Sequence, residues 1–452
     1  MSSTITTTAA IDEALKVIFS DPLVVNIVED SELMSIMQTD MNVSVDNTTG
    51  GRYIEMAHYF QLPAGVGARR EGEYIPEADD PIFKNSRLYL KKIQGTVEMT
   101  GDTMRRVVGD EGAFINYMER ALPDLVTRLV NEIDRMYIGF GAGVKARAAT
   151  ATVDLTGTCT VEVDRALGVD GFTDAFLQFM EGERIVGLDQ AGPLDDSAIL
   201  NPGTAQALTL IDIDEDNGVL TFSGAQATID AWEANGAGMY LVPGDGAGNS
   251  TVDATSGEDR EIAGLMAGAD DGGIVSTYNN IDRSASGNRL WKSIVIDGSL
   301  PVWGGQLTEE LLTFAEDEVS VKGAGRIDTI VSSRAAARGY WQSLKGDRVM
   351  NDPRSFTGGK SGLDIILGDR TVMLKVARKL PPEVCFALQN DTWKRLTLNA
   401  WEWDDRTGSI WNRVTDATGR KDAFYATGVM YENLFCHAPR KNVRIDNLSA
   451  SF

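Results

Sequence analysis

The chain contains little of the side-chain chemistry that enzymes and metal proteins commonly use. Its 452 residues include only two histidines, His58 and His437, and three cysteines, Cys159, Cys385 and Cys436. The cysteines have no metal-ligand or redox spacing, and their odd number argues against a disulfide framework. We therefore expect buried, reduced thiols and two structural histidines, and we predict no catalytic, cofactor-binding or metal-binding residue.

Basic residues are few compared with acidic ones. The 42 Lys and Arg residues are outnumbered by 66 Asp and Glu residues, which gives a formal net charge of -24. Such a charge opposes general binding to nucleic-acid phosphates and to anionic lipid. Most of the excess lies in residues 151–300, which hold 25 acidic and 6 basic residues. We interpret this region as a well-solvated surface module and not as a cation site.

Long apolar runs are absent as well. No segment approaches the roughly 18 apolar residues that a membrane helix needs, and the N-terminus lacks the pattern of a secretory signal. We expect a protein that is made in the cytoplasm and has no membrane partner. The length of 452 residues and the 43% hydrophobic content predict about three domains with their own cores.

The most informative pattern that is present begins at Tyr53. Every second residue from Ile54 to Leu62 is apolar except His58, and a matching return runs from Leu88 to Met99, which predicts an extended hairpin. The stretch between these limbs is too polar and charged to be buried in its own subunit. We expect it to contact another molecule through residues that include Arg69, Arg70, Glu71, Glu73 and Lys84.

A long amphipathic helix is predicted over residues 112–138. Its apolar residues step by three or four positions, which is the spacing of one helical face. Pro123 interrupts the helix without shifting this stripe, so we expect a kink, and Gly139, Gly141 and Gly143 should end the helix. The stripe consists of Phe114, Met118, Leu122, Leu125, Leu129, Ile133 and Met136.

The remaining residues predict two further kinds of structure. Between residues 150 and 300, short strands alternate with turns such as Asn217-Gly218, which favours a small β-barrel or sandwich. After residue 300, two helices alternate with short apolar strands, which predicts a compact α/β domain. The helices are expected at 308–321 and 334–344, and the strands at 327–331, 363–367 and 372–376. The extended run 424–434 should belong to strands that return to an earlier domain.

Several short motifs suggest ligand sites and fail in detail. Residues 354–361 nearly match a phosphate-binding loop, but Arg354 stands where the first glycine is needed. Residues 212–223 have the alternating carboxylates of a calcium loop, but Ser223 stands where a bidentate Glu is required. Four tryptophans could hold a sugar or a base, although packing is the more common use of such residues. They are Trp393, Trp401, Trp403 and Trp411.

The parts follow one another in an informative order: an arm, an extended hairpin, a long helix, an α/β domain and closing strands. More specific are the run Gly325-Arg326-Ile327-Asp328-Thr329-Ile330-Val331-Ser332-Ser333, the helix with Tyr340, the stretch from Gly368-Asp369-Arg370 to Pro381-Pro382, and Trp393. These residues look like the axial domain of one protein family. The whole chain resembles the major capsid proteins of tailed bacteriophages with the Hong Kong 97-type fold.

The resemblance implies an α+β fold with a β-rich insertion. Its expected parts are an N-terminal arm at 1–52, the extended hairpin at 53–100, a peripheral domain at 101–185 with the long helix as its spine, an acidic β-barrel or sandwich inserted at 186–300, an axial α/β domain at 301–400, and return strands at 401–452 that complete the peripheral domain.

The resemblance also implies a function. The chain would assemble with itself into hexamers and pentamers of an icosahedral head shell, with the hairpin across the adjacent subunit. The shell would enclose packaged double-stranded DNA without binding a specific sequence. A scaffolding protein, a portal and decoration proteins would be further partners, and the product would be located in the virion after assembly in the bacterial cytoplasm.

Two other classes stay open. A β-rich tail-tube protein or adhesin would also be acidic and poor in histidine, although it would lack the kinked helix followed by an α/β domain. A hydrolase that uses carboxylates of the acidic region is a further alternative, but the sequence places no paired acid and base.

Overall fold

The structure is a computed structural model, and it describes residues 38–40, 53–63, 65–74, 77, 80–101, 125, 127–154, 157–189, 198–200, 207–235, 238–244, 261–343, 363–367, 370–405, 410–416 and 419–449. The chain forms two compact units, each made of separate stretches of sequence. The first unit comprises Met1–Val45, Leu90–Tyr137 and Arg395–Leu434, and the second comprises Asp46–Tyr89, Ile138–Lys394 and Phe435–Phe452. Within the described residues, no helix is long and apolar enough to cross a membrane.

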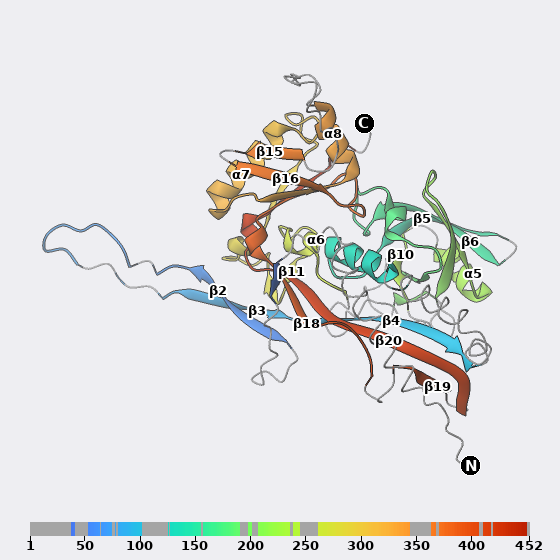
Figure 1. Cartoon of the computed structure of the whole chain (residues 1–452). Helices are drawn as coiled ribbons and strands as arrows, with labels where there is room; N and C mark the ends of the chain where they lie inside the picture. Colours follow the sequence, from blue (N-terminus) through green and yellow to red (C-terminus); the bar gives the residue numbers. More distant parts are fainter. Residues whose placement is uncertain are drawn as a thin grey trace, which may run out of the picture. The chain divides into compact units, whose positions relative to one another are not determined.

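A five-stranded sheet forms the framework of the first unit (Figure 1). Its order is β1-β18-β20-β19, and β4 also pairs with β20. The pairing of β4 with β20 is antiparallel and continues from Ala423 opposite Thr100 to Glu432 opposite Lys91. The strands are β1 (Gln38–Asp40), β4 (Lys91–Thr100), β18 (Trp393–Trp403), β19 (Asn412–Asp416) and β20 (Gly419–Cys436).

Two facing glycines make room for a tryptophan in this sheet. Gly95 on β4 and Gly428 on β20 are register partners. A Cβ atom at Gly428 would lie 1.9 Å from Cζ2 of Trp401, and one at Gly95 would lie 3.0 Å from its Cη2. The indole therefore occupies the space that two side chains would fill, and Trp401 packs against Trp403 at a ring-centroid distance of 6.0 Å. This confirms the packing interpretation for these two tryptophans.

The predicted long helix is described only in its C-terminal half. Residues 127–138 are helical, and the chain leaves the helix at Gly139, as expected. Leu129 and Ile133 of the predicted stripe are buried, whereas Leu125 and Met136 are partly exposed. The stripe residues Phe114, Met118 and Leu122, and the predicted kink at Pro123, lie outside the described residues.

The helix also buries one charged side chain. Arg135 is not one of the apolar stripe residues, yet its side chain is 1% exposed. Its Nε donates to Glu132 at 2.8 Å, so a charge-assisted hydrogen bond accompanies the burial.

The second unit contains a closed six-stranded barrel with the strand order β10-β5-β6-β9-β8-β7. Fully buried side chains such as Val161, Leu210 and Phe222 belong to its strands. Helix α5 (Gln226–Asn235) places Trp232 against Phe222 at a ring-centroid distance of 5.2 Å. The strands are β5 (Ala146–Asp154), β6 (Thr158–Ala166), β7 (Arg184–Leu188), β8 (Leu208–Asp214), β9 (Val219–Ser223) and β10 (Tyr240–Pro243).

Residues 212–223, which resemble a calcium loop but lack its final Glu, include the turn between β8 and β9. One oxygen of the Asp214 carboxylate accepts hydrogen bonds from the backbone N–H groups of Asp216 and Asn217, both at 3.1 Å. These hydrogen bonds and one from the Asn217 side chain lower the pKa of Asp214. The Asp-rich segment is therefore a hairpin turn, as the sequence predicted.

A mixed six-stranded sheet is the second part of this unit, in the order β13-β21-β17-β14-β16-β15. Helices α7 (Glu309–Gly323) and α8 (Arg334–Ser343) contribute Leu311, Leu312 and Tyr340 to its core. Thr308 caps α7 by accepting from the N–H of Leu311 at 3.2 Å. The strands are β13 (Ile294–Asp297), β14 (Thr329–Ser332), β15 (Leu363–Leu367), β16 (Arg370–Val376), β17 (Cys385–Leu388) and β21 (Val443–Asp446).

The predicted α+β class and the elements of the α/β domain are confirmed, but three expected segment assignments are wrong. The barrel runs from Ala146 to Pro243, so its first strands precede the range 186–300. Its first strand consists mainly of Ala and Thr, which gives weak hydrophobic alternation. Furthermore, β21 pairs in parallel with β13 in the mixed sheet, so residues 401–452 do not all return to the same sheet.

The third wrong assignment concerns the hairpin. Strand β2 (Ile54–Gln61) pairs with β3 (Ile82–Leu88), while the predicted return limb is β4 of the first unit. The inward face of β3 carries Lys84 and Ser86, which are polar residues with hydrogen-bond partners. Apolar alternation in the sequence therefore does not reveal β3 and instead matches the next strand, β4.

The glycine pair under Trp401 leads to a stability prediction. Gly428→Ala should lower the free energy of unfolding by about 2 kcal/mol because the new methyl group overlaps the indole ring. Thr427→Ala is the matched control, because it removes only an exposed hydroxyl that lies 3.2 Å from Oγ1 of Thr96. Urea unfolding of dispersed subunits measures both, and equal stabilities of the two variants would contradict the account.

Candidate interaction site

The hairpin β2–β3 changes from buried to exposed along its length. At its base, Leu88 is 1% exposed and pairs with Ile54. Towards the other end, Tyr59 pairs with Phe83, their rings are 4.8 Å apart, and both side chains are exposed. The strands then continue into a long loop (Figure 1). The base is therefore fixed by packing, and the distal half is not covered by its own chain within the described residues.

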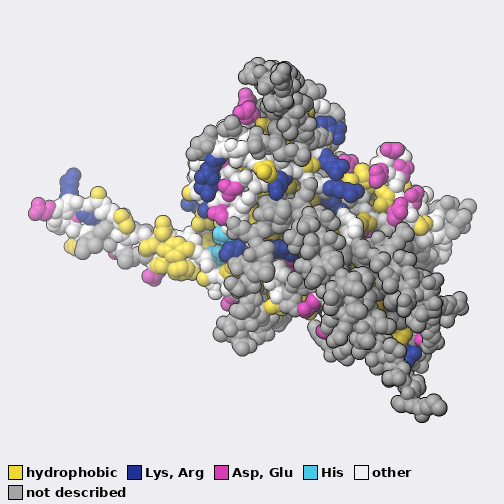
Figure 2. Space-filling model, viewed as in Figure 1, with side chains coloured by type: hydrophobic (Ala, Val, Ile, Leu, Met, Phe, Trp, Pro, Cys, Tyr) yellow, Lys and Arg dark blue, Asp and Glu magenta, His cyan; other side chains and the backbone are white. Residues whose placement is uncertain are grey.

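The distal half is apolar to an unusual degree for an exposed segment. Leu62 is 73% exposed, Val66 is 92% exposed and Tyr74 is 96% exposed, and Ile82 and Phe83 are exposed next to them. Figure 2 shows hydrophobic side chains in yellow along the extended hairpin, with charged side chains at its far end. A concentration of exposed apolar side chains of this kind marks a surface for interaction with another molecule.

A charged turn forms the tip. The N–H of Arg70 donates to Oε2 of Glu73 at 3.0 Å, and the N–H of Glu73 donates to the carbonyl oxygen of Arg70 at 3.2 Å. Gly72 has a φ of 84° in this turn, which favours glycine. Arg69, Arg70, Glu71 and Glu73 are all exposed, so they lie where the sequence predicted, and their contact with another molecule stays a prediction.

Lys84 does not belong to the tip. It lies in β3 opposite His58, and its Nζ donates a hydrogen bond to Oδ1 of Asn288. The same Nζ lies 5.4 Å from the ring centroid of Phe60. The prediction of an intersubunit role for Lys84 therefore rested on the wrong return limb, and in the structure Lys84 helps to fix the hairpin base.

Aromatic packing anchors the base. The ring of His58 lies 4.7 Å from the ring of Trp291 and 5.9 Å from that of Phe435, between centroids. His58 Nε2 and Ser86 Oγ are 2.8 Å apart. The indole N–H of Trp291, in the short helix η3 (Arg289–Trp291), donates to the carbonyl oxygen of Tyr278 at 3.0 Å. We call His58, Ser86, Trp291 and Phe435 the anchor cluster.

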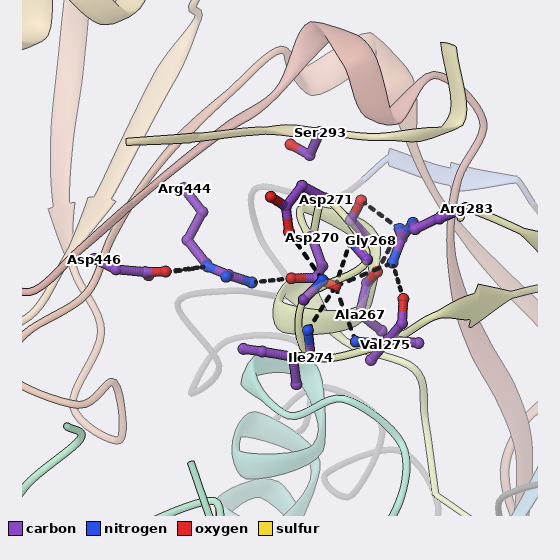
Figure 3. Close-up of polar contacts among 12 residues, drawn as sticks. Ala267, Gly268, Asp270, Asp271, Ile274, Val275, Arg283, Ser293, Arg444 and Asp446 are labelled. Atoms are coloured by element: carbon purple, nitrogen blue, oxygen red, sulfur yellow. Dashed lines mark hydrogen bonds and ion pairs between the residues drawn. The ribbon is translucent and has the colours of Figure 1, made fainter. Parts of the chain in front are cut away.

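A buried ionic network holds the loops that supply Trp291. Asp270 is fully buried and accepts hydrogen bonds at Oδ2 from the N–H groups of Gly272, Ile274 and Val275, at 2.9 to 3.1 Å. Its Oδ1 accepts from the guanidinium of Arg444 at 2.8 Å. Figure 3 shows Asp270 between the guanidinium groups of Arg444 and Arg283.

Arg283 completes this network with its own hydrogen bonds. Its guanidinium donates to four backbone carbonyl oxygens, those of Ala267, Gly268, Val275 and Trp291, at 2.7 to 3.2 Å. The contacts tie helix α6 (Leu265–Gly268), the turn after it and η3 into one body. Sequence reasoning missed this network, because its members are far apart in the chain and Asp270 lies in a Gly-rich stretch typical of a turn.

The titratable groups near the hairpin base favour a structural role. Burial lowers the pKa of His58, and the charge of His437 lowers it further. Burial also lowers the pKa of His437, and the nearby Lys394 and Lys441 add to this while Asp391 opposes it. Both imidazoles are therefore neutral at pH 7. Burial raises the pKa of the Cys436 thiol to about 12, so it is not a thiolate nucleophile.

The three cysteines are free and buried, as predicted. Among the described residues, no group of three or more His, Cys, Asp or Glu side chains could hold a metal ion. Residues 354–361, which nearly match a phosphate-binding loop, lie outside the described residues.

Comparisons with known proteins give matches at the level of structure. No protein-family model matches the chain, and no curated protein matches its sequence. A cyanophage A-1(L) capsid asymmetric unit is similar with a TM-score of 0.47 and 12% identity, covering 88% of both chains. Microbacterium phage Oxtober96 is similar with a TM-score of 0.42 and 10% identity, covering 92% of this chain and 90% of that chain. The satellite phage P4 procapsid that includes the size determination protein matches with a TM-score of 0.35 and 9% identity, covering 95% and 99%.

The ionic network leads to the first prediction for this site. Asp270→Asn removes the charge that Arg444 and Arg283 face, so it should lower the free energy of unfolding by about 3 kcal/mol or more. Asp297→Asn is the control, because this exposed carboxylate faces no guanidinium and accepts hydrogen bonds only from Ser299 and Asn447 among the described residues, and it should cost less than about 1 kcal/mol. Urea unfolding measures both, and a similar small loss in both variants would show that the network is unimportant.

The histidines lead to a pH prediction. Because both pKa values are lowered in the anchored state, a released hairpin binds protons first as the pH falls. The anchor should therefore be fully stable above about pH 6.5 and should weaken below it. Hydrogen exchange of β2 and β3 between pH 7.5 and 5.0 measures the opening, and the rates are first corrected for the intrinsic effect of pH.

The control for the pH prediction is the double variant His58→Gln/His437→Gln, which has no group that titrates in this range at the two positions. Its hairpin protection should be nearly independent of pH. The same acid-induced opening in the double variant would show that another group is responsible, and Asp446, whose pKa is raised by burial, is the first alternative to test.

Proposed function

We propose that the chain is a shell-forming structural protein, the major capsid protein of a tailed phage with the Hong Kong 97-type fold. The observation that carries the proposal is the hairpin. It exposes Leu62, Val66 and Tyr74 by 73% or more, yet its base is fixed by the anchor cluster and the Asp270 network. An arm with an anchored base and an uncovered apolar end is suited to holding a neighbouring copy.

Repetition of the same contact can give a closed shell. In a ring of identical subunits, each hairpin reaches one neighbour and each subunit receives one hairpin, which is a heterologous contact that closes by rotation. Each contact can be modest, because several contacts per subunit act together through effective concentration. The proposed products are hexamers and pentamers that form an icosahedral head and enclose double-stranded DNA.

The order of the observed elements supports the proposal. A hairpin, a helix at 127–138, a mixed sheet with helices α7 and α8, and the long strand β20 follow one another as the resemblance implies. The N-terminal arm is described only at Gln38–Asp40, which pairs with β18. We assign the mixed sheet to the axial domain, the five-stranded sheet to the peripheral domain, and the barrel to the insertion.

The proposed partners beyond the chain itself are a scaffolding protein, a portal and decoration proteins. The net charge of -24 favours a shell that confines DNA over one that grips it. The buried thiols and neutral histidines agree with a structural role, and the proposal assigns no catalytic step to the chain. The mature location would be the virion.

Expression and imaging test this proposal. The wild-type chain, alone or with its scaffolding protein, should form capsomers or closed shells in negative-stain micrographs. Removal of residues 65–81 leaves β2 and β3 intact and should give folded subunits that assemble poorly, because the uncovered end of the hairpin is lost.

Ile211→Ser is the matched control for this deletion. Ile211 is an exposed apolar residue on barrel strand β8, away from the hairpin in the sequence, so its replacement should leave assembly unchanged. Soluble monomers from the wild-type chain under all conditions would count against a capsid protein. Normal shells from the deletion variant would refute the role of the hairpin.

A further inference from the structure

Large apolar side chains are exposed in two concentrations within the part of the chain that the structure describes. One is the distal hairpin. The other surrounds helix α7, where Val302 is 76% exposed, Val321 is 82% exposed, and Leu300 and Phe314 are exposed as well. The other large exposed apolar residues, Ile211, Met373 and Leu398, lie on three different strands. The second concentration has no role in the account given above.

Helix α7 has two different faces. Leu311, Leu312, Ala315 and Val319 are buried in the core of the mixed sheet. Glu310, Phe314, Asp317 and Val321 follow one another at steps of four, three and four, so they form one exposed stripe. We call these four residues the α7 stripe. The preceding loop extends it, because the ring of Trp303 packs against Phe314 at a centroid distance of 5.2 Å.

The α7 stripe carries uncompensated negative charge. Helix α7 contains five acidic residues and one lysine, Lys322, which pairs with Glu318 one turn earlier. Among the described residues, neither Glu310 nor Asp317 has a cationic partner. The surface is therefore apolar at Phe314 and Val321 and acidic between and beside them.

The distal hairpin has the complementary pattern. Its outgoing segment exposes Leu62 and Val66 and then two basic residues, Arg69 and Arg70, with no acidic residue from 62 to 70. Neither guanidinium has a carboxylate partner among the described residues. The nearby Glu73 accepts a backbone hydrogen bond inside the tip turn. The hairpin thus presents apolar side chains and then two arginines, and the α7 stripe presents apolar side chains with carboxylates next to them. The two surfaces are therefore complementary in both polarity and charge.

We propose that the α7 stripe and the loop with Val302 receive the distal hairpin of a second copy of this chain. Leu62 and Val66 cover Phe314 and Val321, and Arg69 and Arg70 pair with Glu310 and Asp317. Each copy offers one hairpin and one α7 stripe, so every surface finds a partner in a closed ring. The inference rests on the proposed function, since it names the surface to which the hairpin binds.

Charge reversal on each side tests the contact. Arg69→Glu/Arg70→Glu and Glu310→Arg/Asp317→Arg should each raise the subunit concentration needed for assembly about tenfold or more, because like charges then face each other. All four positions are exposed, so the variants should fold like the wild type. Asp230→Arg/Glu233→Arg on exposed positions of α5 is the matched control and should assemble normally.

A mixture of the two reversed variants gives the decisive result. In an alternating ring, the acidic hairpin of one variant meets the basic stripe of the other, and the unchanged arginines meet the unchanged carboxylates. At the subunit concentration at which the wild type assembles, neither variant should assemble alone, whereas an equal mixture should recover hexameric rings. Rings with five subunits cannot alternate completely, so pentamers should recover less well than hexamers.

The outcomes separate the two proposals. If the wild type forms shells and the mixture fails to recover hexamers, the α7 stripe is not the binding surface. If the four changes combined in one chain restore assembly while the mixture does not, the contact lies within one copy, and the inference is overturned. If the wild-type chain never assembles, the proposed function fails before this contact is tested.

Discussion

Aromatic packing of the hairpin base against Trp291 is the interaction on which the account depends. An exposed apolar surface is useful for assembly only if it is held in a defined orientation, because each loose residue adds an entropic cost to binding. His58 and Phe435 enclose Trp291, and the indole N–H is satisfied by Tyr278. Asp270, Arg283 and Arg444 then fix the loops on which Trp291 stands. The structure thus provides a firm base and an uncovered end within one hairpin.

The buried charges have a clear structural purpose in this arrangement. A charge in the interior is costly unless it is paired and fully hydrogen-bonded. Asp270 meets two guanidinium groups and three backbone N–H groups, while Arg283 satisfies four carbonyl oxygens. The segment around residues 265–293 has little regular secondary structure, so such a network replaces the sheet and helix hydrogen bonds that would otherwise order it.

Local patterns in the sequence predicted those parts of the fold that local patterns determine. Helix α7 follows from its Thr308 cap and its apolar spacing, and strand β15 has the bounds expected from its apolar run. Non-local pairing was not predictable in the same way. The barrel closes through β5 and β10, nearly a hundred residues apart, and β13 meets β21 across an even longer interval. In the candidate site, the exposed tip could be predicted because its charged residues lie together in one loop. The anchor could not be predicted, because it joins His58, Trp291 and Phe435 from distant segments.

Hydrogen exchange of dispersed subunits and of assembled particles tests the central claim most directly. The account predicts that the base strands, residues 54–58 and 84–88, are already protected in dispersed subunits. Residues 62–74 should exchange rapidly there and should become protected in assembled particles, while the base changes little. Equally rapid exchange of residues 62–74 in both states would contradict the claim that the uncovered end of the hairpin binds a neighbouring copy.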